Sequence, residues 1–206
     1  PFEITTLRRD VKTFGRHAEV QFTDDWREDA KRRDFTMNAL YCDEKGNITD
    51  YFHGVADAKA GDVRFIGDAA ERIAEDGLRI LRFFRFSAHY SEGTVHDNGL
   101  TACHQHREML NQLSGERIAQ EMIKLMRSDY AGEVLRLMKK AQLHPFLFGR
   151  EMDVSPLAAW QKVRLMADVQ REVEIPLALI LRAMDDPEER VAWISSRWNI
   201  SNRWAE

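Results

Sequence analysis

The sequence predicts an α+β fold in which a small mixed sheet with helices comes first and an all-helical portion follows. Runs rich in β-branched and aromatic residues, typical of strands, occur only before Gly61. After Gly61 the apolar residues recur with helical spacing, and prolines separate the later segments. Hydrophobic residues make up 44% and charged residues 31% of the 206 residues, so a folded globular protein is expected.

The first elements are expected to be two strands and a helix. Phe2 to Thr6 and Ala18 to Phe22 have strand patterns, and we expect them to pair in one sheet. Arg8 to Arg16, between these strands, is expected to form a loop. Side-chain oxygens before Trp26 can cap a helix from Trp26 to Leu40, whose acidic start and basic middle suit the helix dipole.

A hairpin and then a series of helices are expected next. Leu40 to Cys42 and Ile48 to Phe52 flank the segment DEKGN, in which Gly46 and Asn47 tolerate the positive φ of a tight turn. Helical periodicity then predicts these helices: Ala69 to Ala88, Leu100 to Leu113, Ser114 to Met126, Gly132 to Lys140, Leu157 to Val173 and Glu188 to Trp198.

Charge and cysteine content limit the classes of function. Thirty basic against 34 acidic residues give a net charge of −4, so any contact with a nucleic acid must be local. The only thiols are Cys42 and Cys103, which favours a reducing, cytoplasmic location. The longest apolar run, Pro176 to Leu181, is far shorter than the roughly 20 residues that span a bilayer. No contact with a membrane is therefore expected.

Charged side chains share one face of the helix predicted around RIAEDGLRILRFFRFSA. At about 100° per residue, an arc of about 120° contains these residues: Arg72, Glu75, Asp76, Arg79 and Arg82. Phe83 and Phe86 border that face, so unpaired arginines on it would carry a desolvation cost. An anionic, planar ligand would satisfy them, because carboxylate and guanidinium groups match the edge of a nucleobase. The alternative is a ladder of ion pairs within the helix, from Glu75 and Asp76 to Arg79.

A second cluster of polar residues lies in the helix expected before the hairpin. Lys31 to Arg33 are basic, and Asp34 and Asn38 are four residues apart, which places both on one helix face. This arrangement can hold a sugar hydroxyl and a phosphate. The alternative is a basic turn exposed to solvent.

Five sequence blocks carry a family resemblance. RRDFTMNAL and EDGLRILRFFRF, together with FEITTLR, GRHAEVQFT and LSGERIAQEMIKLM, resemble the class II tRNA nucleotidyltransferase and bacterial poly(A) polymerase family. This family contains the CCA-adding enzymes of the DNA polymerase beta-like superfamily. The resemblance implies the C-terminal part of a nucleotidyltransferase head at 1–62, a helical neck with the nucleotide-selecting helix at 63–128, and a helical, RNA-binding body at 129–206.

The resemblance also implies roles for single residues. Arg33 would contact a nucleotide phosphate, and Asp34 and Asn38 would bind the ribose. Asp76 and Arg79, oriented by Glu75, would pair with the edge of the incoming CTP or ATP, so that protein side chains act as the template. Arg82 and Arg85 would complete the nucleotide pocket, although Arg85 lies outside the predicted arc of charged residues.

Two further positions are assigned by resemblance. Glu3 would assist Mg²⁺ binding or orient the primer hydroxyl, as a catalytic residue and metal ligand. Glu116 and Arg117 belong to the neck-helix motif, for which a structural role is expected. In the loop that is thought to switch the pocket from C to A, Lys12 and Phe14 stand where the family often has acidic residues.

The main departure from the family concerns the metal ligands. The family's Gly-Ser or Gly-Gly turn and its Asp-x-Asp pair should precede Glu3, and neither pattern occurs in this sequence. The chain is therefore expected to be a fragment without the principal ligands. The expected function is addition of C and A from CTP and ATP to the tRNA 3′ end, with release of pyrophosphate. The alternatives are a poly(A) polymerase of the same family and a noncatalytic RNA-binding module that retains the nucleotide pocket.

Overall fold

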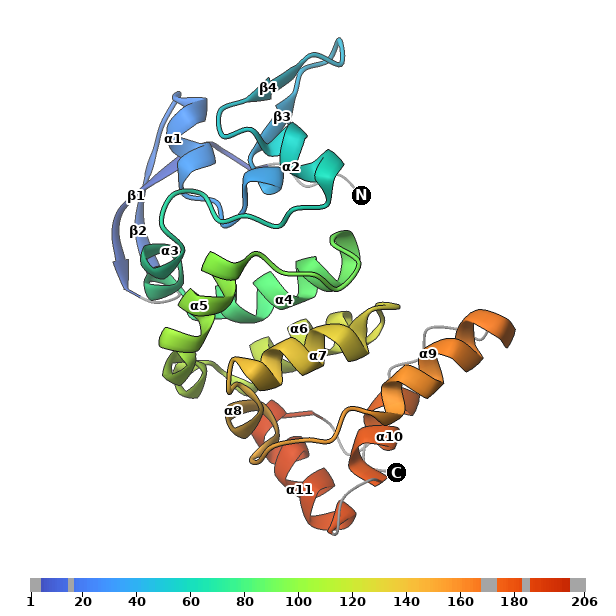
Figure 1. Cartoon of the computed structure of the whole chain (residues 1–206). Coiled ribbons are helices and arrows are strands. Elements are labelled where there is room, and N and C mark those ends of the chain that lie inside the picture. Colours follow the sequence, from blue (N-terminus) through green and yellow to red (C-terminus); the bar gives the residue numbers. More distant parts are fainter. Residues whose placement is uncertain (1–4, 15–16, 168–173, 183–185, 201–206) are drawn as a thin grey trace.

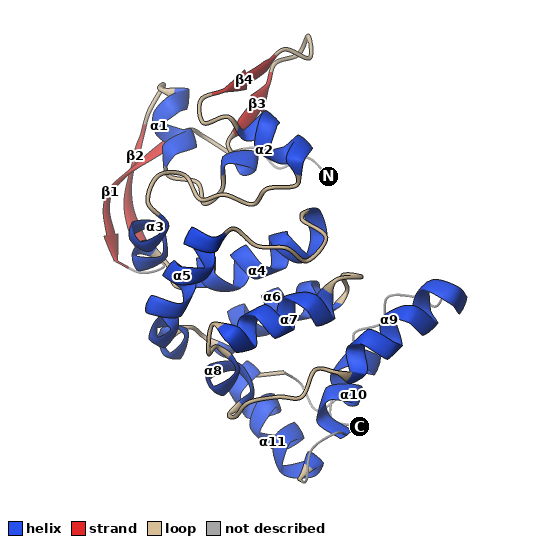
Figure 2. Cartoon of the chain, in the orientation of Figure 1, coloured by secondary structure: helices blue, strands red, loops and turns tan. Residues whose placement is uncertain are grey.

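The computed structural model describes residues 5–14, 17–167, 174–182 and 186–200, and it has the predicted α+β organisation. Figure 1 shows the elements following one another along the molecule in approximately chain order. In Figure 2 the strands lie only at the end that contains the first elements, and all later elements are helices. The predicted succession from an α+β portion to a helical portion is confirmed.

The strands form two separate antiparallel pairs within the described residues. Strand β1 (Arg8–Phe14) pairs with β2 (His17–Phe22), and β3 (Leu40–Cys42) pairs with β4 (Ile48–Asp50). Gly46 has a φ of 84°, which a glycine adopts without steric cost in the turn between β3 and β4. The hairpin predicted around DEKGN is therefore confirmed.

The prediction of a loop from Arg8 to Arg16 was wrong over the described residues. The segment from Arg8 that was expected to be a loop forms β1, whereas Thr5 and Thr6 lie in no strand. The remaining residues of the predicted strand, 2–4, lie outside the described residues. A strand immediately before β2 is favoured physically, because closing a short hairpin costs less chain entropy than pairing more distant segments.

The helix predicted from Trp26 to Leu40 was too long. Helix α1 covers Trp26–Lys31, and its N-cap Asp25 accepts the backbone N–H of Arg27 at 2.8 Å. The chain then extends to form an isolated bridge between Phe35 and Phe65, and a short 3-10 helix, η1 (Thr36–Asn38), follows. Burial of the Phe35 ring, which is 0% exposed, overrides the local helical propensity.

The predicted helix from Ala69 to Ala88 is interrupted. Helix α3 covers Ala69–Glu75 and α4 covers Leu78–Tyr90, with Asp76 extended between them at φ −153° and ψ 110°. The carboxylate of Asp76 accepts the backbone N–H of Leu78 at 3.0 Å, which starts the second helix. The single helical arc assumed for the charged residues was therefore wrong, because α3 and α4 are separate helices.

The single helix predicted from Leu100 to Leu113 is divided into an α-helix and a 3-10 helix, whereas the later predicted helices agree with the structure over the described residues. Helix α2 (Gly54–Ala60) lies in a region for which only a connection was expected. The later elements are α5 (Asp97–Gln105), 3-10 helix η2 (Arg107–Gln112), α6 (Gly115–Met126), α7 (Ala131–Lys140), α8 (His144–Phe148), α9 (Pro156–Ala167), α10 (Glu174–Arg182) and α11 (Pro187–Trp198). The last part of the helix predicted to end at Val173 lies outside the described residues.

Helix α4 lies at the centre of the main core. Ile80, Leu81, Phe83 and Phe84 are each 0% exposed, and α6 and α7 pack against this helix, as Figure 1 shows. A Cβ added at Gly99 of α5 would lie 2.5 Å from the Phe83 ring, so this glycine allows close packing of α5 on α4. The packing holds α4 rigidly, and the polar side of α4 faces the segment between α1 and β3.

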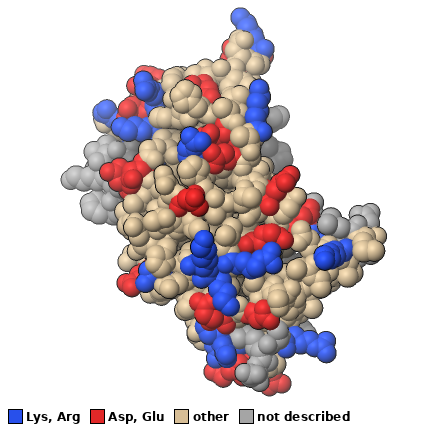
Figure 3. Space-filling model, in the orientation of Figure 1, with Lys and Arg blue, Asp and Glu red and all other residues tan. Residues whose placement is uncertain are grey.

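The surface carries both signs of charge. Figure 3 shows basic and acidic side chains interspersed over this face of the molecule, in agreement with the small net charge. None of the described helices combines the length and the apolar character needed to cross a bilayer.

Candidate functional site

A charged cavity of about 440 Å³ lies between α4 and the segment that joins α1 to β3. Its wall brings together two stretches that are some forty residues apart in the sequence. The lining residues are Arg33, Asp34, Asn38, Asp76, Arg79, Arg82, Arg85 and Phe86. Seven of these were predicted as nucleotide-binding residues, whereas Glu75 is not among the lining residues and Glu3 lies outside the described residues.

Asp76 is fixed by the break between α3 and α4. One carboxylate oxygen, Oδ1, accepts the Leu78 N–H, and Oδ2 accepts a hydrogen bond from Arg117 of α6 at 2.7 Å. The ion pair of Asp76 is with Arg117, a residue outside the helical ladder that the sequence suggested. Asp76 also lines a neighbouring cavity of about 420 Å³ that contains Arg117. Its side chain is 26% exposed and can accept further hydrogen bonds.

Arg79 is engaged mainly by protein groups. It forms an ion pair with Glu75 and donates to the Arg72 carbonyl at 2.7 Å and to the Arg32 carbonyl at 3.0 Å. Arg72 in turn donates to the carbonyl of Lys31 at 2.6 Å. The two arginines therefore attach α3 and α4 to the C-terminal end of α1, where carbonyl groups lack helical partners. The other pair of the considered ladder, Glu75 with Arg79, is present.

Asp34 is a buried carboxylate, 7% exposed, with three hydrogen-bond donors. Asn38 donates to Oδ1 at 2.9 Å, the Phe35 N–H donates to the same atom at 3.0 Å, and Arg82 Nε donates to Oδ2 at 2.5 Å. Burial alone would raise the pKa of Asp34, but the charge and hydrogen bond of Arg82, with those of Asn38 and Phe35, lower it overall. The sequence had suggested that Asp34 and Asn38 lie on one face of a single helix. They do not share a helix in the structure, but their side chains are hydrogen-bonded to each other.

Arg82 and Arg85 direct guanidinium groups to the cavity from successive turns of α4. Each uses only its Nε in an ion pair, Arg82 with Asp34 and Arg85 with Glu121 at 2.6 Å. Their guanidinium carbons lie 5.3 and 4.4 Å from the centroid of the Phe86 ring. Within the described residues their terminal nitrogens make no hydrogen bond, so these groups can receive a phosphate. Arg85 lines the cavity despite its position off the predicted arc.

Arg33 is held at the opposite side by Asp29. Its terminal nitrogen lies 3.1 Å from Asp29, and its guanidinium lies 5.6 Å from the centroid of the Tyr41 ring. Burial tends to raise the pKa of Asp29, but hydrogen bonds from Tyr41, Arg8 and Arg32 lower it to about 2. Burial also opposes the charge on Arg33, yet its bond to Asp29 raises the pKa of Arg33. Asp29 and Arg33 are therefore both charged at neutral pH.

The described carboxylates do not fit a divalent metal ion. No group of three His, Cys, Asp or Glu side chains with metal-binding geometry occurs among the described residues. Asp34 and Asp76 are each held by an arginine, and a guanidinium next to a carboxylate competes with a cation for the same oxygens. These two residues therefore suit hydrogen bonding to a ligand better than metal coordination.

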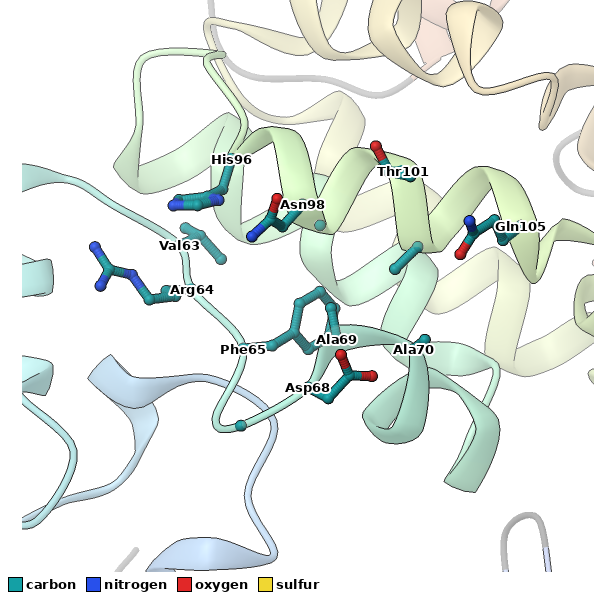
Figure 4. Close-up of a pocket in the computed structure, with 13 residues that line it drawn as sticks. Val63, Arg64, Phe65, Asp68, Ala69, Ala70, His96, Asn98, Thr101 and Gln105 are labelled. Carbon is teal, nitrogen blue, oxygen red and sulfur yellow. The ribbon is translucent and has the colours of Figure 1, made fainter.

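A second cavity, also of about 440 Å³, lies between residues 63–70 and α5. Figure 4 shows Asn98, Thr101 and Gln105 along the facing side of α5, with the Phe65 ring opposite. Arg64 at its edge pairs with Asp62 at 2.7 Å and with Asp57 at 3.3 Å. The lining is thus mostly uncharged and offers no cluster of guanidinium groups. We name the two sites the charged cavity and the uncharged cavity.

Two contributors to the charged cavity had weak or no signals in the sequence. Phe86 was expected only to border the charged face, but it contacts both Arg82 and Arg85. Arg117 had been assigned a structural role, and its ion pair with Asp76 joins residues 41 positions apart. No local pattern in the sequence indicates such a pairing, because it arises from the packing of α6 next to α4.

Comparisons with known proteins agree with the fold. Residues 1–64 match the model of the Poly A polymerase head domain, and residues 94–154 match the probable RNA and SrmB-binding site of polymerase A. CCA tRNA nucleotidyltransferase 1, mitochondrial, of Danio rerio is 40% identical over 91% of this chain and 44% of its own length. The CCA-adding enzyme of Bacillus licheniformis is 34% identical over 98% of this chain and 51% of its own.

Solved structures show the same similarity. The Bacillus stearothermophilus CCA-adding enzyme in complex with CTP is 30% identical, with a TM-score of 0.65 over 98% of this chain and 47% of that chain. The Thermotoga maritima CCA-adding enzyme complexed with tRNA_CCA has a TM-score of 0.67, and the match covers 87% of this chain and 46% of that chain. Because the two sequences are 22% identical, this structure supports the fold alone. The chain spans about half the length of the curated relatives it matches.

Proposed function

Because this chain belongs to the CCA-adding enzyme and poly(A) polymerase family, we propose that the protein adds C and A from CTP and ATP to the 3′ end of tRNA. Pyrophosphate is released at each addition. The observation that carries this proposal is the charged cavity, in which carboxylates and guanidinium groups from two distant stretches face one space. The fit of the sequence to relatives named CCA-adding enzyme over nearly the whole chain supports it.

The charged cavity suits one nucleotide in a defined orientation. Asp76 accepts hydrogen bonds from the exocyclic amino group that cytosine and adenine share, and Arg79 binds an acceptor on the base edge. The terminal nitrogens of Arg82 and Arg85, with Arg33 opposite, bind the phosphates. Polar contacts to the ribose come from Asp34 and Asn38, and Glu75 orients Arg79 through their ion pair.

Base selection follows from the cost of unpaired polar groups. Uracil and guanine present a carbonyl where cytosine and adenine present an amino group, so a wrong base directs an acceptor at the Asp76 carboxylate. A buried polar group without its partner costs about 1–3 kcal/mol, which corresponds to roughly a 5- to 150-fold loss of affinity. Arg117 limits the movement of Asp76 through their 2.7 Å contact, and this raises the cost of accommodating the wrong base.

The order of segments along the chain supports a separate role for each of three parts. We assign residues 1–62 to the nucleotidyltransferase head, 63–128 to the nucleotide-selecting neck and 129–206 to an RNA-binding body. The match of 1–64 to a head-domain model lies close to the first boundary, and the match of 94–154 to an RNA-binding site model overlaps neck and body. The cytoplasmic location remains a proposal, since the Danio rerio relative is named as mitochondrial.

Nucleotidyltransferases of this family generally use a divalent metal ion, and we propose Mg²⁺. Such an ion would supply Lewis-acid chemistry to the attacking 3′ hydroxyl and to the leaving pyrophosphate. Glu3, the proposed ligand and catalytic residue, lies outside the described residues, and none of the described carboxylates forms a metal site. The roles assigned to Asp76 and to the arginines do not depend on the ion.

The test of the proposed function is CTP binding by wild-type and Asp76→Asn chains. CTP at about 100 times its Kd should stabilise the wild type by about 2.7 kcal/mol, which raises Tm by roughly 5–10 °C for a chain of this size. Asp76→Asn should weaken CTP binding while leaving RNA binding unchanged. Asp68→Asn is the matched control, because Asp68 lines the uncharged cavity. Equal losses of CTP and RNA binding in Asp76→Asn would contradict the assignment.

A poly(A) polymerase is the second candidate, because the head-domain model that matches residues 1–64 is named for that activity. Both activities use the same nucleotide pocket, so the products rather than the binding site separate them. Sequencing the RNA made from tRNA that lacks its terminus, with CTP and ATP both present, should show the addition of CCA. Tracts of A would establish the alternative, and CTP binding without any addition would favour a noncatalytic RNA-binding module.

A further inference from the structure

A row of aromatic rings runs from the core past the charged cavity to the surface. The Phe35 ring is 0% exposed, and its centroid lies 5.3 Å from that of Phe86, which lines the charged cavity. The Phe86 centroid lies 5.5 Å from that of Tyr90, with 36° between the ring planes, and Tyr90 is 58% exposed. The row therefore connects the cavity wall to an aromatic face that is open to solvent.

The backbone beneath Tyr90 is fixed although its ring is exposed. Tyr90 is the last residue of α4, and a Cβ added at Gly61 would lie 2.5 Å from the Tyr90 carbonyl oxygen. Gly61 has a φ of 66°, so the chain after α2 approaches α4 as only a glycine readily allows. Within the described residues the Tyr90 hydroxyl makes no hydrogen bond. The ring is thus positioned by its neighbours, while more than half of the residue's surface stays exposed.

We propose that Tyr90, in continuation of Phe86, is a stacking platform for the 3′-terminal base of the RNA that receives the nucleotide. This inference rests on the proposed function and names a contact for its second substrate. The RNA end must lie beside the incoming nucleotide for the bond to form, and the aromatic row passes through the wall of the nucleotide cavity at Phe86. An unpaired base exposes a flat apolar face that an aromatic ring covers favourably.

Stacking also suits the reaction better than recognition by hydrogen bonds. Under the proposed function the terminal base changes after every addition, so a site that reads one base edge would reject the next substrate. An aromatic ring accepts any base, because every base has a π-face. The neighbouring side chains agree with separate sites for the nucleotide phosphates and for the terminal base. Arginines with available donors lie next to Phe86, whereas the ring beside Tyr90 is that of His89, with 6.3 Å between the two centroids.

The competing explanation is that Phe86 and Tyr90 only stabilise the end of α4. Aromatic side chains four residues apart on a helix contact each other in many proteins. That role needs an apolar side chain at position 90 but no aromatic ring, and it has no connection with RNA. The two explanations therefore differ in what Tyr90→Leu and Tyr90→Phe do to the binding of an RNA end.

The test measures dissociation constants for two RNA hairpins with the same single-stranded 3′ end, one with its last base and one abasic at that position. The wild-type chain should bind the RNA with the base at least about fivefold more tightly, the lower range for stacking on one aromatic side chain. Tyr90→Leu should remove this difference, and Tyr90→Phe should keep it. Phe22→Leu is the matched control and should also keep it, because Phe22 is 74% exposed and lines neither cavity.

Equal binding of the two RNAs by the wild type, or an unchanged preference in Tyr90→Leu, would overturn the platform. The CTP-induced rise in Tm is measured on the same variants and should be unchanged in Tyr90→Leu. A wild type that distinguishes the RNAs but shows no response to CTP would count against the proposed function and leave the platform in place. A normal rise in Tm with CTP, combined with equal binding of the two RNAs, would support the proposed function and overturn the platform.

Discussion

The charged and uncharged cavities have the same volume, about 440 Å³ each, but their walls differ in chemistry. Four arginines and two aspartates line the charged cavity, whereas amide, hydroxyl and small apolar groups dominate the other. Volume therefore does not distinguish a nucleotide site in this molecule. The distinguishing property is a set of paired charges whose remaining donors and acceptors face the same space.

The two cavities also differ in what their side chains contribute to folding. The charged cavity depends on ion pairs that join segments distant in sequence, such as Asp34 with Arg82 and Asp76 with Arg117. On the uncharged side, close packing of Gly99 against Phe83 holds α5 in place. Substitutions at the charged cavity should thus act on the ion pairs that stabilise the fold and on ligand affinity, and those at the other cavity on packing alone.

The largest effect is expected for Arg82→Ala. This change leaves the buried carboxylate of Asp34 without its cation, and losing one partner of a fully buried pair typically costs about 3–5 kcal/mol. Because the Arg82 side chain is 31% exposed, we expect a smaller loss of about 2–4 kcal/mol in the free energy of unfolding. Urea denaturation measures it, and a loss below about 0.5 kcal/mol would show that the pair is dispensable.

The pH dependence of stability should depend on Asp29, which holds Arg33 at the charged cavity. Its pKa in the folded protein is about 2, below its ordinary value of 3.8, so the folded state favours the ionised form. The resulting stabilisation, about 2 kcal/mol, is complete above about pH 5 and is lost as the pH falls towards 2. Asp29→Asn should lower stability at pH 7 and flatten the acid limb of the stability curve. An acid limb identical to that of the wild type would contradict this origin of the pH dependence.

At the uncharged cavity, Gly99→Ala should destabilise the fold and leave the affinity for the nucleotide unchanged. The added methyl group would overlap the Phe83 ring, and overpacking of this kind costs about 1–3 kcal/mol. Thermal denaturation should show the loss, while the Kd for CTP, measured well below Tm, should equal that of the wild type. A weakened CTP affinity in Gly99→Ala would show that the two cavities are coupled.

The smallest effect is expected for Thr101→Ala, an exposed position on the uncharged wall. Its stability should change by less than about 0.5 kcal/mol, as for most surface substitutions. Calorimetric titration with CTP should also give an unchanged affinity. A large loss of CTP binding in this variant would indicate that the nucleotide binds in the uncharged cavity instead.

Local patterns in the sequence predicted part of this structure well. The turn at Gly46 and the spacing of apolar residues in α6 and α7 are properties of short segments, and the predicted hairpin and these two helices were confirmed. The errors arose where distant contacts decide the backbone. Phe35 leaves the helical conformation to bridge Phe65, and no nearby residue reveals that partner.

The candidate site shows the same limit. The family resemblance implied that Asp34, Asn38, Asp76 and Arg79 belong to one site, and the cavity contains them all. Their partners were not predictable, because Arg117 reaches Asp76 only through the packing of α6 near the break between α3 and α4. The nucleotide-binding role of these residues stays a prediction until a ligand is observed.

The most direct test of that role is an NMR titration of the chain with CTP. Binding at the charged cavity should shift the amide signals of Asp76, Arg82 and Phe86, while those of Asn98 and Thr101 stay unchanged. Shifts confined to the uncharged cavity, or no shifts up to millimolar CTP, would contradict the account.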